Sequence, residues 1–148
     1  MKKIFLLGAM LCFIGIFASC KDNDNASEAT VSHISFTECK NHIEKGTNDN
    51  WWTGDPDSAS ISYANNTIFI THYNLAVNCG FTDKGILVDI NVDGSTITIS
   101  EYEDPTGLQA DCICATDNSF RINNVPPGTY TLVFTNWYHG PYSTTVTF

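Results

Sequence analysis

The sequence predicts an all-β protein, a single antiparallel β-sandwich with Greek-key connections. First, apolar and polar residues alternate along several short segments, most clearly over Thr129–Thr135, as they do in half-buried strands. Second, turn residues recur between these segments at short intervals, as in Pro126-Pro127-Gly128. Third, no stretch beyond residue 30 combines a helical period with capping residues. Together these patterns favour two stacked sheets of about eight or nine strands.

The first half of the predicted domain contains three strand segments. They span Val31–Thr37, Ser58–Ala64 and Thr67–Cys79, the last as one or two strands. Asn65-Asn66 predicts a tight turn, because asparagine tolerates a left-handed backbone. In Thr67–Cys79 we expect Ile68 and Ile70 on one side and Phe69, Tyr73, Leu75 and Val77 on the other. Residues 40–56 are rich in Asn, Asp and Gly and are predicted to form a loop.

The second half contains the strongest hairpin signal. Ile86 to Val92 alternates cleanly, Asp93-Gly94 predicts the turn, and Ser95–Glu103 predicts the returning strand. A loop follows at residues 104–107. The remaining predicted strands are Phe120–Val125, Tyr130–Asn136 and Tyr142–Phe148.

The N-terminus predicts export. Lys2 and Lys3 precede a short apolar run and the small residues Ala18 and Ser19, the pattern of a secretory signal peptide. The segment Phe17-Ala18-Ser19-Cys20 resembles the lipobox of bacterial lipoproteins, which implies cleavage before Cys20 and acylation of that cysteine; the alternative is an ordinary signal peptide. We therefore expect a signal at residues 1–19, an acylated tether at 20–30 and the domain at 31–148.

The five residues after Cys20 carry a second resemblance. Lys21-Asp22-Asn23-Asp24-Asn25 is similar to the surface-export signal of Bacteroidetes lipoproteins. The resemblance implies an outer-membrane lipoprotein that faces outside the cell. A plain polar tether is the alternative.

Composition excludes one class of partner. Loss of Lys2 and Lys3 with the signal changes the net charge from −9 to −11. Nucleic-acid binding depends on cation–phosphate contacts, so no nucleic-acid partner is expected. The remaining length suits one domain with a hydrophobic core.

Four cysteines remain in the domain: Cys39, Cys79, Cys112 and Cys114. An even number in an oxidising compartment predicts two disulfides. A bridge between Cys112 and Cys114 would be strained, because both lie on one strand. Of the two pairings left, we favour Cys79–Cys112 with Cys39–Cys114. A tetrathiolate zinc site is the rival, although such sites usually show two close ligand pairs.

The C-terminal third resembles a known domain type. Residues 119–132, SFRINNVPPGTYTL, resemble the strand–turn–strand of transthyretin-like and carboxypeptidase-regulatory-like domains, which implies an Ig-like or transthyretin-like sandwich. The mature chain is also similar to small Bacteroidetes lipoproteins of undefined function. His72-Tyr73-Asn74, Asn78-Cys79 and Cys112-Ile113-Cys114 carry that likeness.

Catalytic patterns are weak. The chain has no nucleophile elbow, phosphate loop or zinc-protease motif. Glu101 and Glu103 could pair as in glycosidases, but we expect them to be solvated on one strand face. The histidines are scattered, without metal-ligand spacing. We therefore predict no catalytic residue, no metal and no cofactor.

Aromatic residues in loops are the candidates for ligand binding: Trp51, Trp52, Trp137 and Tyr138. Their rings could stack on a sugar or form a protein hot spot, or they could close the ends of the sandwich. Asp57-Ser58-Ala59 resembles the Bacteroidetes O-glycosylation site, which makes Ser58 a candidate acceptor.

These features predict a surface lipoprotein that binds an extracellular glycan or protein and is not an enzyme. The alternative is a lipoprotein protease inhibitor that protects the cell surface. An inhibitor would present one rigid loop to a protease cleft, whereas a glycan-binding module would use exposed rings.

Overall fold

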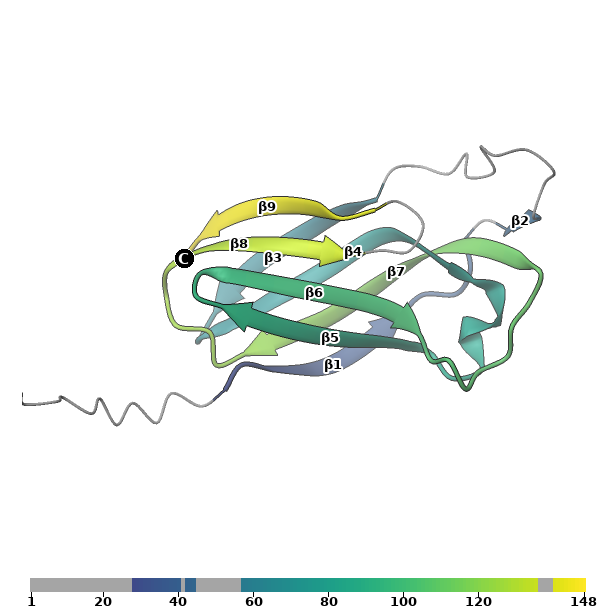
Figure 1. Cartoon of the computed structure of the whole chain (residues 1–148), viewed down its shortest axis with the longest axis horizontal. Helices are drawn as coiled ribbons and strands as arrows, with labels where there is room; N and C mark the ends of the chain where they lie inside the picture. The colour runs from purple at the N-terminus through teal and green to yellow at the C-terminus, as the bar shows by residue number, and fades with distance from the viewer. Residues whose placement is uncertain (1–27, 41, 45–56, 136–139) are drawn as a thin grey trace, which may run out of the picture.

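Two β-sheets pack face to face in a computed structural model that describes residues 28–40, 42–44, 57–135 and 140–148 (Figure 1). The prediction of an all-β sandwich is confirmed. Among the described residues, no helix is long and apolar enough to cross a membrane.

The first sheet has the order β1-β7-β4-β3, and the short strand β2 pairs with the end of β7. Its strands are β1 (Thr30–Phe36), β2 (His42–Glu44), β3 (Ser58–Ala64), β4 (Thr67–Asn78) and β7 (Cys112–Asn123). All described pairs in this sheet are antiparallel.

The second sheet has the order β5-β6-β8-β9. Its strands are β5 (Ile86–Asp93), β6 (Thr96–Glu103), β8 (Thr129–Thr135) and β9 (Tyr142–Thr147). β6 and β8 pair in parallel, while the two outer pairs are antiparallel hairpins. Parallel neighbours require a crossover connection, which β7 provides by crossing to the first sheet and back.

Both predicted hairpin turns have the backbone that their residues favour. Asn65 and Asn66 adopt φ of 53° and 57° between β3 and β4. Gly94 adopts φ of 56° between β5 and β6. These positive values suit asparagine and glycine and match the twist of the flanking strands.

The main core lies between the sheets at the end where these hairpins turn. Alternate residues of β4, β6, β7 and β8 meet there with almost no exposure: Ile68, Ile70, Ile97, Ile99, Phe120, Ile122, Leu132 and Phe134. Each such side chain contributes roughly 1.5–3 kcal/mol of burial free energy. The period-two pattern of the sequence therefore accounts for this half of the fold.

The predicted faces of β4 were wrong beyond Tyr73. Phe69 and Tyr73 are exposed as predicted for one face, whereas Leu75 and Val77, predicted on that same face, are buried. The pairing with β7 shifts between His72 and Leu75, and Asn74 in this bulge adopts φ of 58°. A bulge adds one residue, so every later side chain moves to the opposite face.

Two predicted boundaries also need correction. β7 begins at Cys112 rather than at Phe120, because its polar middle pairs with β4 and β1 although it lacks apolar alternation. β2 lies within the predicted loop 40–56, since Ile43 pairs with Ile113 in the β7 ladder. Pairing partners from distant sequence override local composition in both cases.

Candidate functional site

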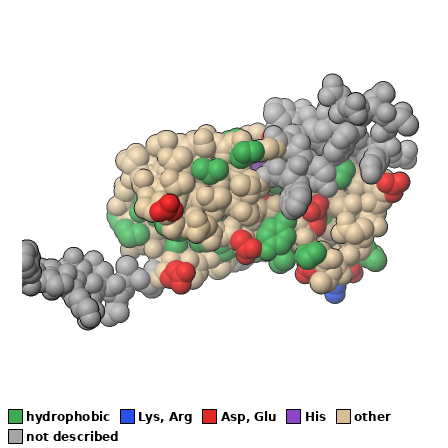
Figure 2. All heavy atoms as spheres, in the orientation of Figure 1, with side chains coloured by type: hydrophobic (Ala, Val, Ile, Leu, Met, Phe, Trp, Pro, Cys, Tyr) green, Lys and Arg blue, Asp and Glu red, His purple; other side chains and the backbone are tan. Residues whose placement is uncertain are grey.

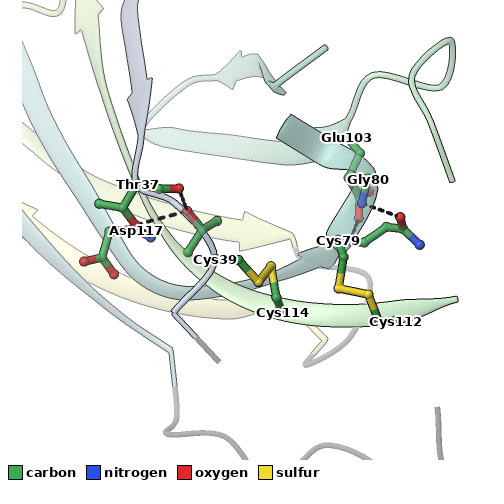
Figure 3. The surroundings of a disulfide bond; sticks show 10 residues. Thr37, Cys39, Cys79, Gly80, Glu103, Cys112, Cys114 and Asp117 are labelled. Atoms are coloured by element: carbon green, nitrogen blue, oxygen red, sulfur yellow. Dashed lines mark hydrogen bonds between the residues drawn. A yellow bond between two sulfur atoms is a disulfide. The ribbon is translucent and has the colours of Figure 1, made fainter. Parts of the chain in front are cut away.

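Two disulfides lie side by side at the end of the sandwich where β7 begins (Figure 3). Cys39 is bonded to Cys114 and Cys79 to Cys112, the favoured pairing, with Cα–Cα distances of 5.6 Å in both bridges. The sulfurs of Cys39, Cys79 and Cys114 lie within 4.8 Å of one another. The bridges therefore join the segment after β1, the η1 turn and β7 at one point.

A second, smaller core surrounds these bridges. It is formed by Leu75, Val77, Phe81, Ile86 and Cys114, with Cys39 and Cys79 packed against it. The short 3-10 helix η1 (Cys79–Thr82) supplies Phe81, whose ring meets Phe36 edge-on with centroids 5.3 Å apart. This end of the domain thus combines covalent bridges with a small apolar cluster.

The loop of residues 104–111 leaves β6 above this cluster and returns into β7. Asp104 folds its start: its carbonyl accepts from the Gly107 amide at 2.9 Å, and its carboxylate accepts from the amide and hydroxyl of Thr106 at 2.8 and 2.7 Å. These bonds from Thr106 lower the pKa of Asp104 below its ordinary value, since they favour the ionised carboxylate. The loop therefore begins with a fixed turn.

Asn78 fastens the other end of the loop. Its side-chain oxygen accepts from the Ala110 amide at 2.8 Å, and its side-chain nitrogen donates to the Ala110 carbonyl at 2.6 Å. The same oxygen accepts from the Gly80 amide at 2.9 Å and caps η1. The backbone amide of Asn78 donates to Glu103 at 2.5 Å, next to the bridge at Cys79 (Figure 3). One side chain thus holds both backbone groups of Ala110 against the domain.

Gly80 lies directly beneath the middle of the loop. A Cβ at this position would be 2.0 Å from the Leu108 carbonyl oxygen and 2.7 Å from its carbon. Only glycine permits so close an approach of two backbones. The main chain of Leu108 therefore rests on η1.

The Leu108 side chain points away from that support. It is 69% exposed, more than any other large apolar side chain among the described residues. The other exposed residues of the loop are Pro105, Thr106, Gln109, Ala110 and Asp111. Asp104 and Asp111 flank it in the sequence, and acidic side chains are spread over the face shown in Figure 2. The loop therefore presents one large aliphatic side chain on a main chain held by hydrogen bonds, with the carboxylates of Asp104 and Asp111 at its two ends.

A buried ionic cluster lies deeper, between the two sheets. Nδ1 of His72 in β4 donates to Glu101 in β6 at 2.5 Å, and Asn118 in β7 donates to the other oxygen of Glu101 at 2.8 Å. Nε2 of His72 lies 3.5 Å from a carboxylate oxygen of Asp57. His72 is 0% exposed and Glu101 3%. Polar groups from both sheets therefore meet where apolar packing would be expected.

The carboxylates determine the charge of His72. Burial alone would lower the pKa of His72, but the hydrogen bond and charge of Glu101, with Asp57 behind them, raise it above its ordinary value. Tyr142 lies beside the cluster, and burial together with the charges of Asp57 and Glu101 raises its pKa to about 12. The raised pKa of His72 therefore favours its protonated form beside these two carboxylates, and the cluster links strands of both sheets.

The prediction that Glu101 and Glu103 are solvated was wrong for Glu101. The alternation that turns Ile97 and Ile99 inward continues to Glu101, which is buried with them. Glu103 is partly buried and accepts from Asn78. Neither carboxylate has the other as its partner: Glu101 binds His72 and Asn118, and Glu103 binds the backbone near the disulfide.

All four residues predicted to bind a ligand lie outside the described part of the chain. This applies to Trp51, Trp52, Trp137 and Tyr138, and also to the lipidation candidate Cys20. Ser58 is exposed at the start of β3, while the preceding Asp57 turns its carboxylate toward His72. The sequence analysis did not identify Leu108 or its support by Asn78 and Gly80. The available signal was a large apolar residue in an otherwise mostly polar loop.

The opposite end of the sandwich holds an open groove of about 480 Å³. Apolar residues line most of it: Ala29, Ile90, Val92, Ile97, Val125 and Tyr130. Asn124 there donates to the carbonyl of Glu28 at 3.2 Å, so the chain enters the domain at this end. Glu28 and the loop of Leu108 therefore lie toward opposite ends of β6 (Figure 1).

No protein-family model, curated protein or solved structure matches this chain.

Proposed function

We propose that this chain is a surface-exposed outer-membrane lipoprotein whose β-sandwich binds an extracellular protein and carries out no catalysis. The observation that supports it best is the loop of residues 104–111, in which Leu108 is 69% exposed above a fixed backbone. An exposed apolar side chain on a preorganised support is suited to bury itself in a partner pocket, because little conformational entropy is lost on binding.

The position of the loop fits an anchor at Cys20. The chain enters the domain at Glu28, beside the β5–β6 turn, whereas the loop follows the far end of β6. Eight residues of strand span roughly 25 Å. A tether from the membrane would therefore leave the Leu108 end of the domain facing outward.

The chemistry of this loop favours a protein over a glycan. Sugars are bound mainly by flat aromatic faces and hydroxyl partners, whereas Leu108 offers a branched aliphatic group. The ring candidates for a glycan, Trp51 and Trp52, lie in residues 45–56, outside the described residues. The proposal therefore commits to a protein ligand.

A capture experiment tests this function. The chain with Cys20→Ala is immobilised and exposed to extracellular proteins, and the bound proteins are quantified by mass spectrometry. We expect to capture proteins that bind both the otherwise wild-type chain and a Val92→Asp control but do not bind the Leu108→Asp variant. Val92 is 46% exposed and lies at the opposite end of β5, so it matches Leu108 in character but not in place. Glycan-array binding that survives Leu108→Asp, with no protein lost by that variant, would contradict the proposal.

A further inference from the structure

We propose that the cysteines of the two bridges form a zinc site when both bridges are reduced, with one Zn²⁺ bound by four thiolates. The ligands of this four-cysteine cluster are Cys39, Cys79, Cys112 and Cys114. The sequence is compatible with two disulfides or with a tetrathiolate site, and the structure brings the same four residues together. The cluster is thus a cross-link with two states, and its zinc state does not depend on the proposed role of Leu108.

The first argument is the convergence of the sulfurs. The Sγ atoms of Cys39, Cys79 and Cys114 lie within 4.8 Å of one another although they belong to two bridges (Figure 3). Thiolates bind Zn²⁺ tetrahedrally at about 2.3 Å, which places their sulfurs about 3.8 Å apart. Cys79 therefore needs to approach the other two by at most about 1 Å. The fourth sulfur, that of Cys112, is bonded to Cys79, and alternation along β7 turns it to the same side as Cys114.

The second argument is that hydrogen bonds hold the cysteine segments together independently of the bridges. Asn78 of β4 pairs with Ile113 of β7, and on the other side of β7 the Lys40 amide donates to the Ala115 carbonyl at 2.9 Å. A cysteine of the cluster is adjacent in the sequence to each of these four residues. Reduction of the bridges therefore leaves the thiols close to one another. Ligands that are already positioned lose little conformational entropy when the ion binds.

The third argument concerns the type of site. Cys114 is 0% exposed, and the other three cysteines are partly buried. Four thiolates fill every position of a tetrahedral zinc ion, and such closed sites are structural rather than catalytic. Soft thiolate ligands also favour Zn²⁺ over the hard cations Mg²⁺ and Ca²⁺. The ion therefore acts as a cross-link in place of the bridges.

Passage from the bridges to the zinc site requires a reductant of the dithiol class. Each disulfide accepts two electrons and two protons from one dithiol, which is itself oxidised to a disulfide through a mixed-disulfide intermediate. Zn²⁺ then displaces the four thiol protons, so its binding becomes tighter as pH rises. Oxidation of the four thiolates reverses the process and releases the ion.

Cobalt binding, followed by displacement with zinc, tests the proposal. The whole chain is used with Cys12→Ala and Cys20→Ala, so that the cluster provides its only thiols, and a phosphine reduces both bridges in the absence of oxygen. We expect the reduced chain to bind one Co²⁺ with strong sulfur-to-cobalt charge-transfer absorption and the visible bands of a tetrahedral site. One equivalent of Zn²⁺ should abolish both, and the oxidised chain should show neither. Circular dichroism of the zinc-loaded chain should keep the β-sheet signal of the oxidised chain, because the strand pairing is unchanged.

Single substitutions in the reduced chain identify the ligands, and loss of a bridge does not enter this comparison. Cys39→Ser and Cys79→Ser should each weaken zinc binding by more than the roughly 10–100-fold that loss of an outer-shell partner costs. Asp111→Asn is the matched control, because it removes an exposed carboxylate beside Cys112 and should leave the cobalt spectrum unchanged. Absence of charge-transfer absorption in the reduced chain, a stoichiometry other than one ion per chain, or loss of the β-sheet signal on zinc loading would overturn the proposal. Undiminished zinc affinity in Cys79→Ser, or loss of the spectrum in Asp111→Asn, would also overturn it.

Discussion

The contact between His72 and Glu101 leads to a stability prediction with a definite magnitude. Replacing Glu101 by leucine removes an acceptor from His72 at 2.5 Å and from Asn118 at 2.8 Å, both buried. Removal of one partner of a buried ion pair costs about 3–5 kcal/mol, because the other charge stays buried without its main partner; His72 would keep only Asp57 at 3.5 Å, and Glu101 only Asn118. We expect this loss in the free energy of unfolding for Glu101→Leu and a similar loss for His72→Leu.

The double variant separates the pair from its surroundings. With both charges replaced, no buried charge remains from the pair. Asn118 loses a hydrogen-bond acceptor, which costs about 1–3 kcal/mol, and Asp57 loses a charged neighbour at 3.5 Å. The double variant should therefore be destabilised by less than the sum of the singles, with a coupling energy well above about 0.5 kcal/mol.

Urea unfolding at pH 6, followed by circular dichroism and tryptophan fluorescence with the disulfides intact, measures these free energies. Ile97→Val is a core control on the same strand as Glu101, two residues further from it than Ile99, and its effect should add to that of His72→Leu. If the losses for Glu101→Leu and His72→Leu add up to that of the double variant within about 0.5 kcal/mol, the reasoning is refuted, because the effects of residues in direct contact are not additive.

Three further predictions follow from other features. Since the raised pKa makes folded His72 bind its proton more tightly than the unfolded chain does, stability should be highest below the ordinary histidine pKa and fall as pH rises through the raised one. Equilibrium unfolding between pH 5 and 9 measures this slope, and an equal slope in His72→Leu would contradict it. Replacing Cys79 and Cys112 by serine should cost about 3.7 kcal/mol, and replacing Cys39 and Cys114 about 4.5 kcal/mol, because the bridges close loops with sequence separations of 33 and 75. Denaturant melts of the two serine pairs test this, and a larger loss for the shorter loop would argue against the entropic account. Cys20→Ala should move the chain from the detergent phase to the aqueous phase, and mass spectrometry of an unmodified wild-type Cys20 would reject the anchor.

Much of the fold could be predicted because local patterns agree with the tertiary structure there. Strand β3 has the predicted bounds, and the Asn65-Asn66 and Asp93-Gly94 turns occur where the sequence indicated them. The alternation of Ile97, Ile99 and Leu132 gave the faces of the central strands. Period-two burial and turn chemistry are local properties, so one sequence is enough to identify them.

The sequence could not predict the features that depend on pairing between distant segments. The bulge at Asn74 reverses the faces of β4, and its position follows from the register with β7. His72 and Glu101 are 29 residues apart, and neither has a neighbour in the sequence that indicates an ion pair. The contacts of Asn78 with Ala110 and of Gly80 with Leu108 likewise join segments about 30 residues apart.

The two ends of the sandwich are stabilised by different means, and the difference bears on where a partner binds. At the end that holds Glu28, apolar strands pack on one another and the turns are short. At the other end, the apolar cluster is small, and two disulfides and the Asn78 hydrogen bonds fix a loop that is itself mostly exposed. Under the proposed function, rigidity beneath Leu108 would preorganise the loop for its partner, because the entropy of ordering the loop is then lost in folding and not again in binding.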